Sequence, residues 1–159
     1  MQTIRFKNLN LSNDEFLLDM GCGEGRHSIG AYIETQANIL GLDLSMKDLK
    51  IAQKRLNDFD TSNIKSVCQF GEADIVSIPL LDSSLDAVIC SEVLEHVNSP
   101  QESIKELIRV LKPGGVLALS VPRFMPELIC WKLSKEYSKT PGGHVRIFTH
   151  QQLKKLGIN

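Results

Sequence analysis

Three glycines at alternate positions follow a short apolar segment, and this feature constrains the fold more than any other. The apolar run Phe16–Met20 contains Asp19 near its end and is followed directly by Gly21, Gly23 and Gly25. A stretch with helical periodicity comes next. This order is typical of a buried strand, a turn whose backbone a ligand can approach, and a helix. Such a unit cannot bury its strand alone, so we expect the rest of the chain to supply a parallel sheet around it.

Strand-like and helical patterns alternate along the remainder of the chain. After Phe16–Met20, the predicted strands are Asn38–Asp43, 64–70, 85–90 and 116–121. The predicted helices are 25–36, 45–58, 91–97, 100–111, 126–137 and 149–156. This alternation predicts an α/β fold with a doubly wound, Rossmann-like parallel sheet. Residues 1–15 are polar and mixed, and we interpret them as a lead-in to one domain that spans 16–159.

The composition is that of one domain with nearly balanced charge. Of 159 residues, 18 are basic, 19 are acidic and 42% are hydrophobic. This balance gives no general attraction for nucleic acid or for an anionic membrane, so both are disfavoured as partners. The four cysteines form no C-x-x-C pair, which favours reduced thiols. Together with the lack of a leader-like or membrane-spanning apolar run, this predicts a cytoplasmic protein.

The spacing of the glycines disfavours a dinucleotide-binding turn. A dinucleotide fingerprint needs its third glycine at the position that Arg26 occupies here, so an NAD-dependent oxidoreductase is a disfavoured alternative. Asp43 ends the second predicted strand about twenty residues after the turn, where a carboxylate can reach the 2′- and 3′-hydroxyls of a ribose. The alternative role for Asp43 is an exposed strand-end carboxylate or a helix cap.

Five motifs resemble, in order and spacing, those of class I S-adenosylmethionine-dependent methyltransferases of the type 11 family. They are the glycine turn 17–25, the segments 41–45 and 71–75, the fourth strand with its exit 85–97, and the turn 111–115. The resemblance implies a methyltransferase that uses S-adenosylmethionine to methylate oxygen, nitrogen or carbon of a small-molecule acceptor. The alternative is a domain that binds this cofactor but is catalytically silent or depends on a partner.

The resemblance also implies which residues bind the cofactor. They are Asp19, Gly21, Cys22, Gly23, Gly25, Asp43, Leu44, Asp74, Ile75 and Ser91. The glycines would line the methionine portion, while Asp19 would hold the loop and the amino group of the cofactor. Asp43 would bind the ribose hydroxyls, and Asp74 with Ile75 would contact the adenine. Ser91 would lie under the sulfonium.

The acceptor side is less clearly marked. Glu92, Glu95 and His96 stand at i, i+3 and i+4, which would place two carboxylates and an imidazole on one face of a helix. We interpret His96, together with His144 and Arg146 from a later glycine-rich loop, as catalytic residues. Because similar patterns bind metal in some relatives, the same face with His144 is also a candidate divalent-metal site. A metal-free structural pair is the alternative.

Members of this family usually continue into two further strands beyond the last helix predicted here. We therefore expect this chain to contain five of the family's seven strands. The outer edge of the fifth strand would then present unpaired backbone groups. We expect that edge to be able to support a homodimer.

Overall fold

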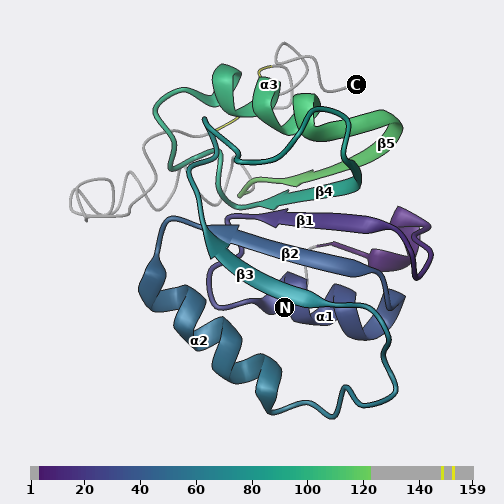
Figure 1. The fold of residues 1–159 in the computed structure, drawn as a ribbon. Coiled ribbons are helices and arrows are strands. Elements are labelled where there is room, and N and C mark those ends of the chain that lie inside the picture. Colours follow the sequence, from purple (N-terminus) through teal and green to yellow (C-terminus); the bar gives the residue numbers. More distant parts are fainter. Residues whose placement is uncertain (1–3, 123–147, 149–151, 153–159) are drawn as a thin grey trace.

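A five-stranded parallel sheet forms the centre of the protein. The computed structural model describes residues 4–122, Phe148 and Gln152. The strands are β1 (Phe16–Met20), β2 (Asn38–Asp43), β3 (Cys68–Glu72), β4 (Leu85–Ser91) and β5 (Leu111–Ser120). They lie in the order β3-β2-β1-β4-β5, and each neighbouring pair is parallel (Figure 1). From β1 the chain adds β2 and β3 on one side, and it then returns past β1 to add β4 and β5 on the other side. This reversal between β1 and β4 confirms the predicted doubly wound fold.

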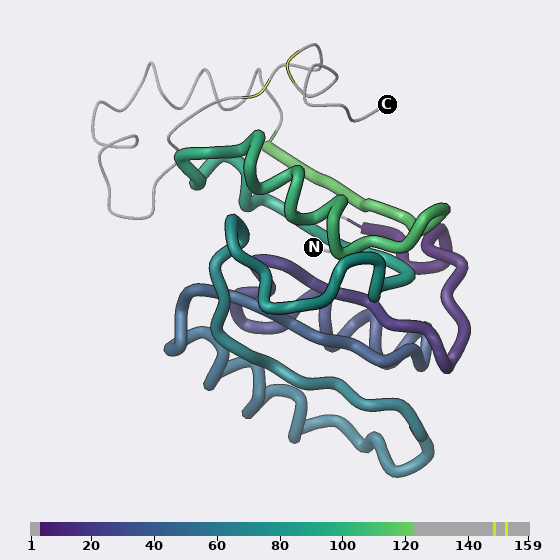
Figure 2. The backbone as a smooth tube through the Cα atoms, turned by 45° about the horizontal axis from the view of Figure 1, so that its top comes forward, coloured from purple at the N-terminus to yellow at the C-terminus, as the bar shows by residue number. Residues whose placement is uncertain are grey.

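Helices cover the two faces of this sheet. They are α1 (Arg26–Thr35), α2 (Met46–Asn57) and α3 (Pro100–Val110). The first two lie on one side of the sheet and α3 lies on the other (Figures 1 and 2). Successive residues of β1 alternate between the two sides. Leu17 belongs to the core that contains Tyr32 of α1, whereas Leu18 belongs to the core that contains Leu107 of α3.

The segment ahead of β1, for which the sequence predicts no structure, contributes to one of these cores. It forms a short 3-10 helix, η1 (Phe6–Leu9), whose two terminal side chains are buried. The Phe6 ring meets the imidazole of His27 edge-on, with their centroids 6.3 Å apart. Ile4 and Leu11 pack against the same core, but the spacing of these four apolar residues matches neither a helix nor a strand, so only the packing reveals their role.

Two later elements have boundaries that differ from the prediction. β3 begins at Cys68 rather than at residue 64, and β5 begins at Leu111 rather than at 116. The proline and glycines at 113–115, which predict a break between helix and strand, lie inside β5. The pairing of β4 with β5 shifts register at this point. The irregular backbone is therefore accommodated as a bulge in β5, an outermost strand among the described residues.

The segment that follows β4 is a turn, so the helix predicted at 91–97 is wrong. Glu92 has a φ of +58°, in the left-handed region, and its N–H donates to the carbonyl of Ser120 at 2.9 Å. The His96 N–H closes a short turn onto the carbonyl of Val93 at 2.9 Å. A residue with positive φ interrupts a right-handed helix. The three side chains predicted for one helical face therefore do not share one.

Some predictions concern residues that lie outside the described part of the chain. These are the helix 126–137, the glycine-rich loop 138–143 and most of the helix 149–156. The division into a lead-in at 1–15 and a core at 16–159, and the homodimer through the sheet edge, stay predictions. No helix within 4–122 combines the length and the apolar character needed to cross a membrane.

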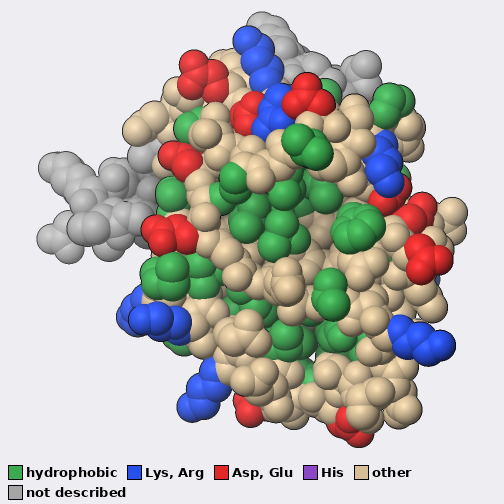
Figure 3. Space-filling model, viewed as in Figure 1, with side chains coloured by type: hydrophobic (Ala, Val, Ile, Leu, Met, Phe, Trp, Pro, Cys, Tyr) green, Lys and Arg blue, Asp and Glu red, His purple; other side chains and the backbone are tan. Residues whose placement is uncertain are grey.

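One face of the molecule shows how its surface side chains are distributed. Apolar side chains gather over the middle of this face, while basic and acidic side chains alternate around its rim (Figure 3). This face therefore presents no continuous surface of one charge.

Candidate functional site

The glycine turn joins β1 to α1 at the carboxyl edge of the sheet. Gly21, Gly23 and Gly25 have φ angles of +75°, +50° and +80°. L-amino acids with a side chain rarely adopt such angles. The N–H groups of Gly21 and Cys22 both donate to the carbonyl of Leu42 in β2, at 2.7 and 3.1 Å. The turn is thus anchored to the neighbouring strand as well as to its own.

The space beside these glycines differs from one position to the next. A methyl group on Gly21 would overlap the side chain of Val93 in the turn after β4. A methyl group on Gly23 would meet no atom within 4 Å. Packing within the protein therefore requires glycine at the first position. At Gly23 the open space lets a ligand approach the backbone.

Asp43, the last residue of β2, forms the other side of this site. Its Oδ2 accepts a hydrogen bond from the Gly23 N–H at 2.8 Å, and its Oδ1 accepts one from the Ser45 N–H at 2.8 Å. Each carboxylate oxygen can accept two hydrogen bonds, so both retain capacity for hydroxyl donors. Leu44, the next residue, is 62% exposed. Asp43 therefore holds the glycine turn in place and can still accept hydrogen bonds from a ligand.

Asp19 lies beneath the turn, 1% exposed. The Ser28 hydroxyl of α1 donates to its Oδ2 at 2.6 Å. Burial raises the pKa of Asp19 to about 6, against the lowering effect of the Ser28 hydrogen bond, and the charge of Asp43 adds to the rise. Burial also raises the pKa of the Cys22 thiol well above its usual range. Cys22 is therefore not a thiolate nucleophile at neutral pH.

The turn after β3 carries the residues predicted to contact adenine. The Ser77 N–H donates to the carbonyl of Asp74 at 3.0 Å, and the Asp74 carboxylate accepts the Val76 N–H at 3.1 Å. The turn is tied to β2 because the Ala73 N–H donates to the carbonyl of Asp43 at 3.1 Å. Ile75 is only 2% exposed and packs into the core on the α3 side.

The fourth strand ends in a pair of hydroxyl groups. Ser91, the last residue of β4, is 8% exposed, and its hydroxyl lies 2.7 Å from that of Ser120 at the end of β5. The two residues are paired in the register of the sheet. The sequence did not single out Ser120, because no local pattern shows which residue of a neighbouring strand will pair with Ser91.

The acceptor-side candidates are only partly within the described residues. Glu95 is 1% exposed, and its carboxylate lies 4.0 Å from Nε2 of His96, whose side chain is 35% exposed. His144 and Arg146 lie outside the described residues. Within 4–122, Phe148 and Gln152, no three His, Cys, Asp or Glu side chains converge as metal ligands. The structure therefore does not support the predicted metal site.

The geometry brings together most of the residues predicted for cofactor binding. They sit at the carboxyl ends of β1, β2 and β4 and in the turn after β3, which is where open α/β sheets bind ligands. Hydrogen bonds link the glycine turn to Asp43, and Asp43 to the turn after β3. Val93 and Ser28 belong to the same site but carry no sequence signal, because both act only through tertiary contacts.

Comparison with known proteins identifies the family. A family model described as a methyltransferase domain matches residues 18–119, from β1 to β5. The chain belongs to this methyltransferase family. The chain is 30% identical to the demethylmenaquinone methyltransferase of Lactobacillus johnsonii over 149 residues, which cover 88% of this chain and 60% of that relative. The chain spans three fifths or less of the length of the curated relatives it matches.

Solved structures have the same fold as this methyltransferase domain. The YcgJ protein of Bacillus subtilis matches with a TM-score of 0.77 and 19% identity, over 95% of this chain and 63% of that one. The cyclase SpnF matches with a TM-score of 0.64 and 28% identity, over 71% of this chain and 40% of that one. These matches confirm the Rossmann-like methyltransferase fold.

Proposed function

We propose that this protein uses S-adenosylmethionine to methylate a small organic acceptor. The observation that carries the proposal is the open backbone at Gly23 beside the Asp43 carboxylate, at the point where the sheet order reverses. A relative with 30% identity is a demethylmenaquinone methyltransferase, which favours a small-molecule acceptor. The family membership favours S-adenosylmethionine over a nicotinamide cofactor.

The chain's own residues fit such a ligand in three places. Asp43 would accept the ribose hydroxyls with the acceptor capacity that its backbone contacts leave. The glycine turn, from Gly21 to Gly25, would lie along the methionine portion, with Asp19 holding the turn and facing the amino group. The adenine would lie against the turn at Asp74 and Ile75, which presents backbone and the exposed Asp74, since the Ile75 side chain is buried.

Bound S-adenosylmethionine would supply a methyl group already activated on a sulfonium. The task left to the protein is mainly to align the acceptor, and such alignment can lower a barrier by about 7–11 kcal/mol. Ser91 would lie beneath the reacting centre, with its hydroxyl oriented by Ser120. His96 is partly exposed beside the buried Glu95 and would accept the acceptor's proton where the acceptor is a weakly acidic hydroxyl. We propose His144 and Arg146 as further acceptor-side residues.

A binding and turnover experiment tests the proposal. Calorimetric titration should detect S-adenosylhomocysteine but not NADH, and a labelled methyl group should pass from S-adenosylmethionine to a member of a panel of quinols, catechols and amines. Binding of NADH instead would contradict the proposal. Because SpnF, which has the same fold, is named a cyclase, binding without methyl transfer to any acceptor would favour a role other than methyl transfer.

Asp43→Asn should weaken the binding of S-adenosylhomocysteine by about tenfold or more. The loss of a charge-assisted acceptor for the ribose hydroxyls corresponds to roughly 1.4 kcal/mol for each factor of ten. Glu34→Gln makes the same change of charge on the exposed outer side of α1 and should leave the affinity unchanged. Equal affinities of the two variants, measured by calorimetry, would remove Asp43 from the proposed site.

A further inference from the structure

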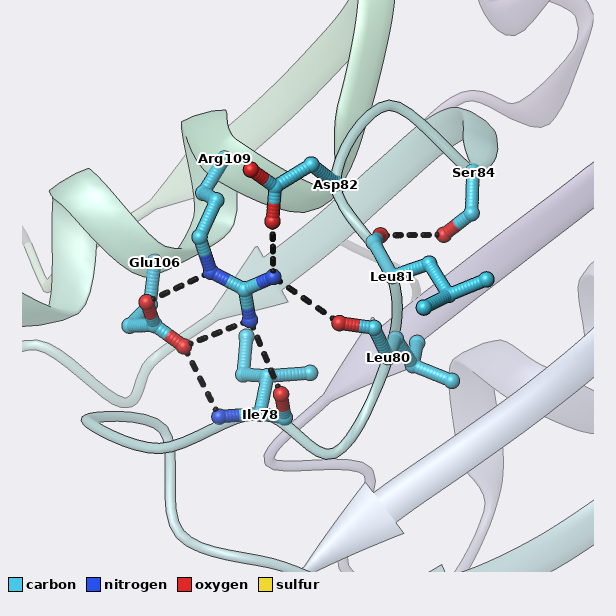
Figure 4. A network of polar contacts seen from close by, with 7 residues as sticks. All are labelled: Ile78, Leu80, Leu81, Asp82, Ser84, Glu106 and Arg109. Atoms are coloured by element: carbon cyan, nitrogen blue, oxygen red, sulfur yellow. Dashed lines mark hydrogen bonds and ion pairs between the residues drawn. The ribbon is translucent and has the colours of Figure 1, made fainter.

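The Arg109 side chain of α3 binds the loop between β3 and β4 at several points. Arg109 donates to the carbonyls of Ile78 and Leu80 at 2.9 and 2.8 Å, and to the Asp82 carboxylate at 2.7 Å (Figure 4). Its remaining N–H groups donate to Glu106 at 2.7 and 2.8 Å. A guanidinium has five N–H donors, and all five are used here. Arg109 therefore gives two backbone carbonyls of the loop the hydrogen bonds that a helix or strand would otherwise provide.

Glu106 adds a direct contact with the backbone of the same loop. Its Oε2 accepts the Ile78 N–H at 3.0 Å while also accepting from Arg109 (Figure 4). The N–H and the carbonyl of Ile78 are thus both bound by side chains of one helix. Because the Glu106 side chain is only 21% exposed, water competes poorly for these contacts.

This clamped residue lies next to the turn proposed to face the adenine. Ser77, which precedes Ile78, closes the turn onto the carbonyl of Asp74, and Ile75 and Ile78 are both buried in the core on the α3 side. On its other side the turn is tied to β2 through Ala73. Only the segment from Asp74 to Ser77 separates the two attachments, so a change at Ile78 has little chain in which to be absorbed.

We propose that Arg109 and Glu106 are positioning residues that set the affinity of the cofactor site by holding the turn Asp74–Ser77 in its binding conformation. This inference rests on the proposed function, because it takes that turn to contact the adenine. Neither side chain needs to touch the ligand. An ordered turn reduces the conformational entropy that binding would otherwise have to remove.

Two conservative variants and a matched control test this inference. Glu106→Gln keeps the shape of the side chain but loses its charge, and Arg109→Lys keeps the charge but loses the planar fork. The control is Asp86→Asn, which makes the same change in another ion pair: Asp86 binds Lys112 at 2.7 Å and the Phe16 N–H at 2.9 Å, and its side chain is 17% exposed. It lies near the start of β4, at the amino edge of the sheet, opposite the carboxyl edge that carries the proposed cofactor site.

The measurements are the Kd of S-adenosylhomocysteine, the Kd of 5′-deoxy-5′-methylthioadenosine, and the thermal midpoint of each variant. We expect Glu106→Gln and Arg109→Lys, the two clamp variants, each to raise both Kd values by about tenfold, since both ligands carry the adenine. Asp86→Asn should change the Kd values by less than about twofold. Amide exchange at Val76–Ile78 should also be faster in Glu106→Gln than in the control. The thermal midpoints show how much stability each variant has lost.

The outcomes separate the two proposals. A wild-type protein that binds neither ligand overturns the proposed function, and the inference with it. A wild-type protein that binds both ligands, with clamp variants that follow the control at equal loss of thermal stability, overturns the inference alone. Weaker binding confined to the clamp variants supports it.

Discussion

Gly21→Ala is expected to lower the free energy of unfolding by about 3 kcal/mol or more. The added methyl group would overlap the Val93 side chain, and the residue would have to keep a φ of +75°. Overpacking a site of this kind costs about 1–3 kcal/mol, and left-handed strain in a residue with a side chain adds about 1 kcal/mol or more. Urea unfolding followed by circular dichroism measures the loss.

Gly23→Ala is the matched control for this prediction. It has a similar backbone strain at a φ of +50° but no atom within 4 Å of the new methyl group, so about 1 kcal/mol of stability should be lost. Its methyl group would enter the proposed ligand space, so the binding of S-adenosylhomocysteine should fall sharply. Adding Val93→Ala to Gly21→Ala should restore part of the lost stability. Equal stabilities of the two glycine variants would show that the contact with Val93 does not limit this position.

The first two strands, together with the glycine turn and Asp43, could be predicted because their sequence signals are local. Phe16–Met20 and Asn38–Asp43 have the predicted bounds, since each is a mainly apolar run that ends at a glycine or an aspartate. Ser45 caps α2 as expected, with its hydroxyl accepting the Asp48 N–H at 3.3 Å. Glycine and aspartate at the ends of such strands mark the ligand edge of a parallel sheet.

The parts that could not be predicted depend on residues distant in sequence. Glu92 leaves the helical region although its neighbours have helical spacing, and its N–H bonds to the carbonyl of Ser120, 28 positions later in the chain. Arg109 is one basic residue at the end of an amphipathic helix, and only the fold brings its acceptors at Ile78 and Leu80 within reach. In both cases the deciding partner is a backbone carbonyl, which leaves no trace in the identity of the residue that carries it.

Two buried groups should give opposite dependences of stability on pH. Burial raises the pKa of Asp19 from 3.8 to about 6, so the folded state holds this proton longer than the unfolded chain does. Stability from this group is present below about pH 4 and falls as the pH rises through 6. Burial, with the nearby charge of Arg26, lowers the pKa of His27 from 6.5 to about 4, so stability from this group rises over nearly the same range.

His27→Gln is therefore expected to expose the effect of Asp19. As the pH rises from about 4 to 7, the free energy of unfolding of His27→Gln should fall by about 2–3 kcal/mol more than that of the wild type. The reason is that the variant lacks the opposing contribution of His27, while that of Asp19 remains. Asp19→Asn should change in the opposite direction by a similar amount, and the double variant should follow wild type closely in its pH dependence. The groups that titrate elsewhere are common to all four proteins and cancel in these differences. Urea unfolding at four pH values measures them, and a His27→Gln curve parallel to wild type would show that the imidazole titrates alike in the folded and unfolded chain.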